Sequence, residues 1–336
     1  MHLQIIEVGT WRSLVAHYAG GVGVAGSNPV VPTIFLFFES FIMSTKLRVG
    51  WIGLGVMGFS MARNLLHRGV ELFVYSRTKE KAIPLLNSGA HWADTPAELT
   101  PKVDYLFSMV GYPKDVESIY FDDHGIFSSL EGGKVLIDMT TSSPVLAERI
   151  AEQAKNVGSF ALDAPVSGGD VGAKKGSLAI MCGGEQEIYD RCLKLLEIMG
   201  TNIQLFGLAG SGQRVKMSNQ ILIASTMIGT VEALLYAEKA NLDLNKVISL
   251  IGQGAAGCWS LNQLGPRMVQ EDWAPGFFVK HFVKDMGIAL EDAGRMNLKL
   301  KGLELAMSFY DRVKDAGYSE NGTQVLLKVL RGLNQQ

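Results

Sequence analysis

Residues 46–69, KLRVGWIGLGVMGFSMARNLLHRG, contain a strand pattern, a glycine-rich turn and a helix pattern in that order. The run KLRVGWI has the composition of a buried parallel strand. Three glycines with the spacing G-x-G-x-x-G follow it, and the helical pattern after them stops at Gly69. The amides and dipole at the start of such a helix suit a pyrophosphate. The stretch therefore predicts a dinucleotide-binding βα unit, with cofactor contacts at Gly53, Leu54, Gly55, Val56, Met57 and Gly58.

The same spacing occurs earlier, at Gly21–Gly26, but with different flanks. Pro29 and Pro32 follow it closely, and a regular helix cannot continue through two prolines so placed. The earlier turn therefore offers no helix N-terminus to a phosphate. We assign the cofactor to the later turn alone.

Residues 1–42 need a different explanation. They make a poor signal peptide, because Glu7 precedes the apolar part and Glu39 interrupts it before any cleavage site. Their apolar run is also far shorter than the roughly 18 residues of a membrane span. The stretch GVGVAGSNPVVPT resembles the end of a tRNA gene read as protein, and Met43 would be a normal start. We interpret residues 1–42 as a mis-called extension that is disordered if it is made.

From Lys46 onward, short β-rich runs alternate with helical runs, as in a parallel, doubly wound sheet with right-handed crossovers. Strand signals stop near Ala209, and residues 212–242 are apolar on nearly every helical face, which is typical of a helix buried in the middle of the molecule or between subunits. We predict an α/β fold: a Rossmann-type domain over residues 46–209, then an all-helical domain over residues 210–333. The expected strands are KLRVGWIG (46–53), VELFVYS (70–76), VDYLFSMVG (103–111), KVLIDMT (134–140), FALDAPVSG (160–168), LAIMCGG (178–184) and NIQLFG (202–207).

Composition excludes several classes of protein. Of the 336 residues, 47% are hydrophobic and 19% are charged, which suits a globular chain with a large core. The 31 Lys and Arg nearly balance the 33 Asp and Glu, without runs of like charge, so we expect no nucleic-acid partner. The 3 cysteines fit neither a disulfide framework nor a zinc site, and the 6 histidines are isolated. We expect a protein of the reducing cytoplasm, without a metal.

The end of the second predicted strand carries the residues that choose between NAD and NADP. In NAD-binding folds, an acidic side chain about 20 residues after the glycines binds the ribose hydroxyls. Here Ser76 occupies this position, and Arg77 and Thr78 follow. A guanidinium pairs with a 2′-phosphate, which a carboxylate would repel. We predict NADP as the preferred cofactor over NAD; the alternative is that Arg77 is only a solvated charge.

Four motifs carry a family resemblance. In order, they are GWIGLGVMGFSMARNLL (50–66), DAPVSGG (163–169), GSGQRVKMSNQ (210–220) and KDMGIAL (284–290). Together they resemble the 3-hydroxyisobutyrate dehydrogenase family of β-hydroxyacid dehydrogenases, which includes tartronate semialdehyde and glyoxylate or succinic semialdehyde reductases. The resemblance covers nearly everything from Lys46 to Leu333. It implies a fold like that of 6-phosphogluconate dehydrogenase and an NAD(P)-dependent oxidoreductase that acts on a short hydroxy acid or semialdehyde.

The resemblance also makes Lys216 the catalytic general acid and base. A lysine in an apolar, largely dry setting exchanges its proton nearer to neutral pH than a free lysine does. Asn219 and Gln220 share its helix face and are expected to contact the substrate or orient the amine. Most family members carry two asparagines here, so Gln220 departs from the pattern at a substrate contact.

The other motifs supply the remaining contacts that the resemblance implies. Ser167, Gly168 and Gly169 offer a hydroxyl and open amides to a substrate carboxylate, although a tight turn would also need these glycines. Thr141 and Lys284 are expected near the nicotinamide, with Asp285 helping to fix the helix, and Met109 and Val110 match the loop that passes under the cofactor. The residues of CWSLNQLGPRMVQEDWAPGFF (258–278) favour core and subunit packing; as an alternative that the resemblance does not supply, Trp259, Phe277 and His281 would close the substrate pocket.

We therefore expect a cytoplasmic, NADP-preferring dehydrogenase of a small carboxylate-bearing substrate, assembled as a homodimer or homotetramer, with no membrane partner. Two alternatives remain open. A relative without catalysis would act as an NADP-binding oligomeric scaffold or sensor, but it would have no chemical reason to keep the lysine and both glycines. An enzyme acting on imines would keep the fold, but such relatives usually replace the lysine.

Overall fold

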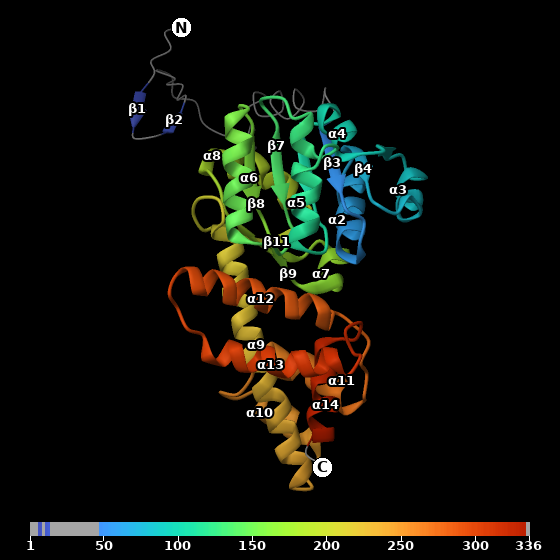
Figure 1. The fold of residues 1–336 in the computed structure, drawn as a ribbon, viewed down its shortest axis with the longest axis vertical. Coiled ribbons are helices and arrows are strands. Elements are labelled where there is room, and N and C mark those ends of the chain that lie inside the picture. Colours follow the sequence, from blue (N-terminus) through green and yellow to red (C-terminus); the bar gives the residue numbers. More distant parts are fainter. Residues whose placement is uncertain (1–5, 9–10, 14–46, 334–336) are drawn as a thin grey trace, which may run out of the picture. The chain divides into compact units, whose positions relative to one another are not determined.

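The computed structural model describes three stretches of the chain, residues 6–8, 11–13 and 47–333. It divides the chain into two compact units, Met1–Thr45 and Lys46–Gln336. In the first unit, β1 (Ile6–Val8) pairs antiparallel with β2 (Trp11–Ser13) (Figure 1). The rest of residues 1–42, for which we predict disorder, lies outside the described residues. The predicted site belongs to the second unit.

A six-stranded sheet forms the core of the first part of this second unit, residues 47–207, which we call the sheet lobe (Figure 1). All of its neighbouring strands pair in parallel. Its spatial order corresponds to 3-2-1-4-5-6, which is the Rossmann order. The predicted doubly wound sheet is confirmed. In that order the strands are β5 (His91–Trp92), β4 (Glu71–Tyr75), β3 (Arg48–Ile52), β6 (Tyr105–Ser108), β7 (Val135–Asp138) and β8 (Phe160–Asp163).

Successive side chains along the strands point to opposite faces of the sheet. They contribute to two hydrophobic clusters, one on each face. Trp51 and Phe107 belong to the first cluster, where their rings stack with centroids 5.5 Å apart. Ile52, Leu106 and Leu136 belong to the second. Helices on both faces cover these clusters, as crossovers between parallel strands require. They are α2 (Val56–His67), α3 (Ile83–Leu86), α4 (Pro96–Leu99), α5 (Pro113–Phe121) and α6 (Pro144–Asn156).

The last two predicted strands do not join this sheet, which corrects the sequence-based prediction. They form β10 (Leu178–Cys182) and β11 (Gly200–Leu205), which pair in parallel in a second sheet. The short β9 (Val166–Ser167) pairs antiparallel with β10. The two-residue β5 was not predicted, because so short a strand carries no periodic signal. Two helices accompany this sheet, α7 (Gly169–Lys175) and α8 (Gln186–Leu196).

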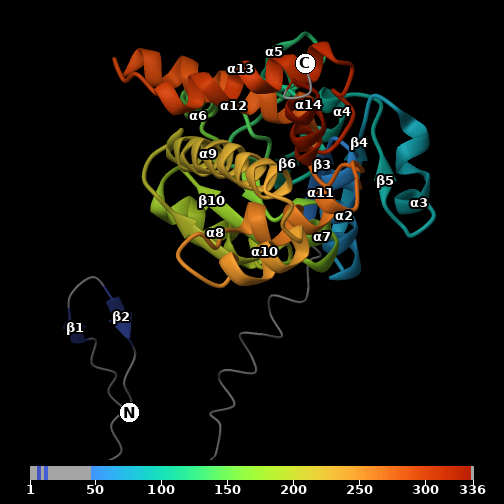
Figure 2. The same cartoon turned by 90° about the horizontal axis from the view of Figure 1, so that it is seen from below.

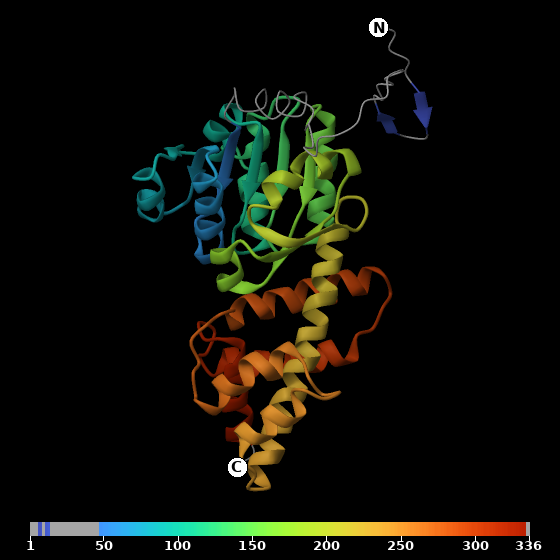
Figure 3. The same cartoon turned by 180° about the vertical axis from the view of Figure 1, so that it is seen from behind.

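The rest of the described chain, residues 211–333, forms the helical lobe. Figure 3 shows its first helix, α9 (Ser211–Lys239), running from the sheet lobe into the helical lobe. Two antiparallel helices, α12 (Val279–Arg295) and α13 (Lys301–Asp315), pack against α9 and each other (Figure 2). The smaller elements are α10 (Leu244–Ile251), a π-helical turn (Ser260–Leu264), α11 (Gly265–Val269), a 3-10 turn (Thr323–Val325) and α14 (Leu326–Leu333).

α9 has an unusual composition for a helix at the centre of the fold. Within the described residues it is the only helix that is long and apolar enough to cross a membrane, by length and composition alone. Its sides instead contact β10, α6, α10, α12, α13 and α14, and Gln213, Lys216 and Gln220 are buried along it. The helix predicted over residues 212–242 is confirmed as α9, which joins the two lobes and is buried over only part of its surface.

Candidate active site

The glycine turn after β3 has the backbone geometry of a phosphate-binding turn. Gly53 has φ +98°, and a Cβ there would collide with the carbonyl oxygen of Met109. A Cβ on Gly58 would collide with the carbonyl oxygen of Gly53, so these two positions need glycine for close packing. Gly55 is different, because a Cβ there meets nothing within 4 Å. The missing side chain leaves open space in front of α2, which fits a pyrophosphate.

The first turn of α2 completes this cradle. Val56 is 60% exposed, Met57 is partly buried, and the first turn carries no acidic residue that would repel an anion. The first amides of a helix have no partner inside it and remain available to phosphate oxygens. Leu54 is 3% exposed and packs its side chain into the core, so only its backbone borders the turn.

The residues predicted to select the cofactor follow β4, which lies beside β3. The strand ends meet directly, since Gly53 N donates to Tyr75 O at 2.9 Å. Ser76 is partly buried, whereas Arg77 and Thr78 are exposed. The Arg77 guanidinium lies 3.0 Å from a carboxylate oxygen of Asp115 in α5. The geometry thus brings a cation to the predicted 2′-phosphate position, together with an acidic partner that the sequence did not indicate.

The loop after β6 passes under the glycine turn. Met109 N donates to Ile52 O at 2.9 Å, which holds the loop against the end of β3. Val110 N donates to Thr140 Oγ1 at 3.0 Å, at the end of the next strand, β7. Met109 and Val110 therefore lie between the glycine turn and the turn that carries Thr141.

Thr141 and Lys284 come from different lobes and meet in a hydrogen bond. The Lys284 Nζ donates to Thr141 O at 2.6 Å. It also lies 3.0 Å from Asp285 Oδ1, an oxygen that accepts no hydrogen bond from the part of the chain that the structure describes. Lys284 is 11% exposed at its side chain and is therefore held, rather than free in solvent. This hydrogen bond joins the turn after β7 to α12.

Lys216 is buried near the start of α9. It is 7% exposed, and burial lowers the pKa of its ammonium group from 10.5 to about 8. The positive charge of Lys284 lowers this pKa further, while the carboxylate of Asp285 opposes the shift. An amine with a pKa near 8 is present in both protonation states close to neutral pH, as proton transfer in both directions requires.

Gln220 and Asn219 form a chain of hydrogen bonds beside this lysine. Asn219 Nδ2 donates to Gln220 Oε1 at 2.7 Å, and Gln220 Nε2 donates to Asp285 Oδ2 at 2.6 Å. Gln220 is 1% exposed, so its amide is engaged at both ends inside the protein. The longer side chain at this position reaches α12, while the partly buried Asn219 lies nearer to the surface.

The glycines of DAPVSGG form a turn that faces the helical lobe. Gly168 has φ +132° and Gly169 has φ +63°, which other residues adopt only with strain. A Cβ on Gly169 would lie 3.8 Å from the carbonyl oxygen of Gly276, in the loop before α12. Ser167, at the end of β9, is partly buried beside them. This turn and the loop at Gly276 therefore face each other between the lobes.

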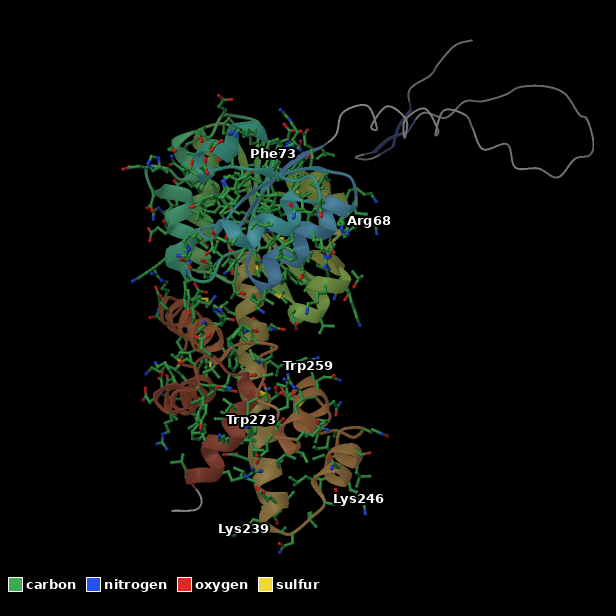
Figure 4. All side chains as sticks on the ribbon, turned by 90° about the vertical axis from the view of Figure 1, so that its right-hand side faces the viewer. Arg68, Phe73, Lys239, Lys246, Trp259 and Trp273 are labelled. Atoms are coloured by element: carbon green, nitrogen blue, oxygen red, sulfur yellow. The ribbon has the colours of Figure 1, made fainter. Side chains whose placement is uncertain are left out.

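Of the aromatic candidates for the pocket, two lie near the contact between lobes. The His281 ring packs on Tyr112 of the sheet lobe, with centroids 5.4 Å apart, and Phe277 follows Gly276 directly. Trp259 is 65% exposed and lies in the helical lobe, as do Trp273 and Lys239 (Figure 4). Within the described chain, no hydrogen bond or ring contact joins Trp259 to the predicted site residues.

Two family models match the two lobes in turn. Residues 48–207 match the NAD-binding domain of 6-phosphogluconate dehydrogenase. Residues 210–330 match the NAD-binding domain of NADP-dependent 3-hydroxyisobutyrate dehydrogenase. A probable 3-hydroxyisobutyrate dehydrogenase-like 1 protein of Arabidopsis thaliana is 46% identical over 88% of this chain and 89% of its own. The chain belongs to the 3-hydroxyisobutyrate dehydrogenase family. It is an NAD(P)-dependent oxidoreductase.

Other relatives of this family member share most of its length. An uncharacterised oxidoreductase of Bacillus subtilis, YkwC, is 53% identical over 84% of this chain and 99% of its own. The 2-hydroxy-3-oxopropionate reductase of Escherichia coli is 35% identical over 84% and 97%. The structure of 3-hydroxyisobutyrate dehydrogenase from Mycobacterium tuberculosis with L-serine superposes with a TM-score of 0.79, at 26% identity, over 85% of this chain and all of that one.

Sequence reasoning missed two buried residues that hold this dehydrogenase's site together. The Asp163 carboxylate accepts from Gly210 N at 2.7 Å and from Gln213 N at 2.8 Å, so it caps the start of α9. Gln213 is fully buried and bonds the turn on both sides of Thr141. The only signal was a glutamine three residues before Lys216, on the same helix face.

Proposed function

We propose that this family member is an NADP-preferring dehydrogenase that interconverts a short aldehyde acid and its hydroxy acid. The observation that carries the proposal is the buried Lys216, whose pKa is lowered to about 8 beside Lys284 and Asp285. A lysine that only stabilised the fold would gain nothing from such burial, because burying an ammonium group costs free energy. General acid–base chemistry gives this burial a purpose.

Each part of the site has one task in this proposal. The turn Gly53–Gly58 and the start of α2 bind the pyrophosphate, and Arg77 binds the 2′-phosphate. The bound nicotinamide ring supplies or accepts the hydride. Thr141 and Lys284 hold its end of the cofactor. Ser167–Gly169 bind the substrate carboxylate, while Lys216 gives a proton to the carbonyl oxygen in reduction and takes it back in oxidation.

The substrate class follows from the size and polarity of these groups. A turn suited to a carboxylate and an amine suited to proton transfer support an acid with a carbonyl group as the substrate. The names of the relatives, 3-hydroxyisobutyrate dehydrogenase and 2-hydroxy-3-oxopropionate reductase, support short β-hydroxy acids. A methyl or hydroxyl difference among such acids changes binding by only about 1 to 3 kcal/mol, so the acid itself requires an assay.

A substrate panel tests the proposal. NADPH and NADH oxidation is followed with tartronate semialdehyde, methylmalonate semialdehyde, succinic semialdehyde and glyoxylate. We expect turnover with at least one of them and a preference for NADPH; activity with NADH alone would refute the role of Arg77. Lys216→Ala should lower kcat by at least about 100-fold, because it removes the proton donor, while NADPH still binds. Unchanged turnover in this variant would refute the assignment of Lys216.

We also infer a cytoplasmic homodimer or homotetramer. A stripe along α9 is exposed and points away from the helical core, with Leu222 at 65% and Tyr236 at 77% exposure on either side of Gly229. A second copy would cover these apolar side chains, which are costly to leave in water. Light scattering on the purified protein measures the mass directly, and a monomer at micromolar concentration would contradict this inference.

A further inference from the structure

Gln213 lies in the first turn of α9 and is fully buried. Its amide is used at both ends: Nε2 donates to Thr140 O at 2.8 Å, and Oε1 accepts from Ser142 N at 2.9 Å. An amide buried without partners costs free energy, so these two bonds fix the side chain in one orientation. Gln213 therefore holds the backbone immediately before and immediately after Thr141.

The turn that Gln213 holds exposes only its middle residue. Thr140 and Ser142 are each 1% exposed, whereas Thr141 is partly exposed between them. Two further elements grip the same turn, because Val110 N donates to Thr140 Oγ1 at 3.0 Å and Lys284 Nζ donates to Thr141 O at 2.6 Å. The turn is thus fixed from the sheet lobe, from α9 and from α12, and Thr141 is the residue that it presents.

The same helical turn is also fixed to the sheet lobe. Asp163 accepts from the backbone N–H of Gly210 and of Gln213, and a Cβ on Gly212 would collide with Met181 O in β10. Lys216 lies three residues after Gln213, and residues with this spacing share a helix face. The segment of α9 that bonds the Thr141 turn is therefore the segment that carries the Lys216 amine. A shift of this segment would move the turn and the amine together.

We propose that Gln213 is a positioning residue, which fixes the Thr141 turn relative to Lys216 and so sets where the nicotinamide end of the cofactor lies beside the amine. This inference rests on the proposed function. Gln213 is fully buried and bonds the turn on both sides of Thr141, so it would act through the turn. If Gln213 had only a structural role, its substitution would lower only the stability of the protein. If it is a positioning residue, its substitution should weaken the binding of the nicotinamide end of the cofactor and leave the binding of the adenosine end unchanged.

One substitution separates these two roles. Gln213→Met replaces the amide with an apolar chain of similar length and removes both hydrogen bonds to the turn. In calorimetric titrations of the full-length protein, NADPH should bind about tenfold more weakly. Turnover should fall about 100-fold, because the reacting atoms lose their alignment. The probe 2′-phospho-ADP-ribose, which is NADP without its nicotinamide, should bind as it does to the wild type, because Gly53–Gly58 and Arg77 are unchanged.

Gln324 provides the matched control. It is 1% exposed, and its Nε2 donates to Asp272 O at 2.8 Å and to Ala274 O at 3.0 Å, within the helical lobe. Gln324→Met should lower the Tm as Gln213→Met does, but leave the affinities for both ligands unchanged. Where Gln213→Met does not fold, Gln213→Asn, whose amide is one methylene shorter, is measured for the same contrast.

The outcomes separate the positioning role of Gln213 from the proposed function of the protein. Selective weakening of NADPH in the Gln213 variant supports the positioning role. Equal weakening of NADPH and 2′-phospho-ADP-ribose, or no weakening of NADPH, overturns it. If the wild type binds neither ligand, the proposed function fails, and this inference fails with it.

Discussion

At the scale of single residues, the charges around Lys216 oppose each other. Burial and the charge of Lys284 lower the pKa of Lys216, while the charge of Asp285 raises it. Both neighbours lie next to each other in α12, and Asp285 is also tied to α9 through Gln220. The balance between them decides how much of the amine carries a proton near neutral pH, and each neighbour can be changed separately.

Asp285→Asn should move the pH profile of reduction to lower pH. In this direction Lys216 donates a proton, so kcat/KM should fall as the pH rises through a pKa near 8 in the wild type. The asparagine can still accept the bond from Gln220 but lacks the charge that raises this pKa. Lys284→Met is the matched control and should move the fall to higher pH. Profiles at saturating NADPH that shift in neither variant would contradict this electrostatic model.

At the scale of elements, the end of β4 and the start of α5 meet at the predicted 2′-phosphate position. Arg77 pairs there with Asp115, which also accepts from Tyr112 N at 3.1 Å. A bound phosphate has to share the guanidinium with this carboxylate and lies within the reach of its negative charge. On the proposed cofactor site, we therefore expect Asp115 to oppose NADP binding and Arg77 to favour it.

Asp115→Asn should tighten NADP binding. The pair is largely exposed at Arg77, so the gain is small, about threefold in Kd at low salt, and it should diminish at high salt. The Kd for NAD should change less, because NAD has no 2′-phosphate. Glu117→Gln is the control, since Glu117 lies in the same helix but pairs with Arg149 at 2.7 Å. Equal effects of the two variants on NADP would show that only net charge matters.

Long, regular elements could be predicted from the sequence, and contacts between distant segments could not. β3, α2 and α9 each carry a periodic or glycine signal of their own. β5 and β9 have two residues each and exist only because neighbouring strands hold them. The motifs pointed to Lys216 and Lys284. The two side-chain hydrogen bonds of Gln213, however, connect it to Ser142 and Thr140, which precede it in the sequence by 71 and 73 positions. Such a contact leaves no local pattern.

At the scale of the whole molecule, two buried carboxyl groups link the pH to the stability of the fold. Asp138 ends β7 and Asp163 ends β8, side by side in the sheet and close to the start of α9. Burial raises the pKa of each from 3.8 to about 6, while hydrogen bonds from neighbouring backbone or hydroxyl groups oppose the rise. The folded state therefore holds these protons more tightly than the unfolded chain does.

The contribution of these two groups to the free energy of unfolding should consequently be fully present below about pH 4 and be lost as the pH rises to about 7. A pKa raised by about two units costs up to about 3 kcal/mol for each group once it is ionised. Asp138→Asn should remove about half of this loss, because it removes one of the two titrating groups. The hydrogen bonds should persist, since Ser108 Oγ and Thr140 N both donate to Oδ1, an oxygen that the asparagine retains. Urea unfolding at a series of pH values measures the slope, with Asp311→Asn on the surface of α13 as a control. If Asp138→Asn leaves the slope unchanged, Asp138 has the same pKa in the folded and the unfolded state. Its burial would then make no pH-dependent contribution to the stability of the fold around the start of α9.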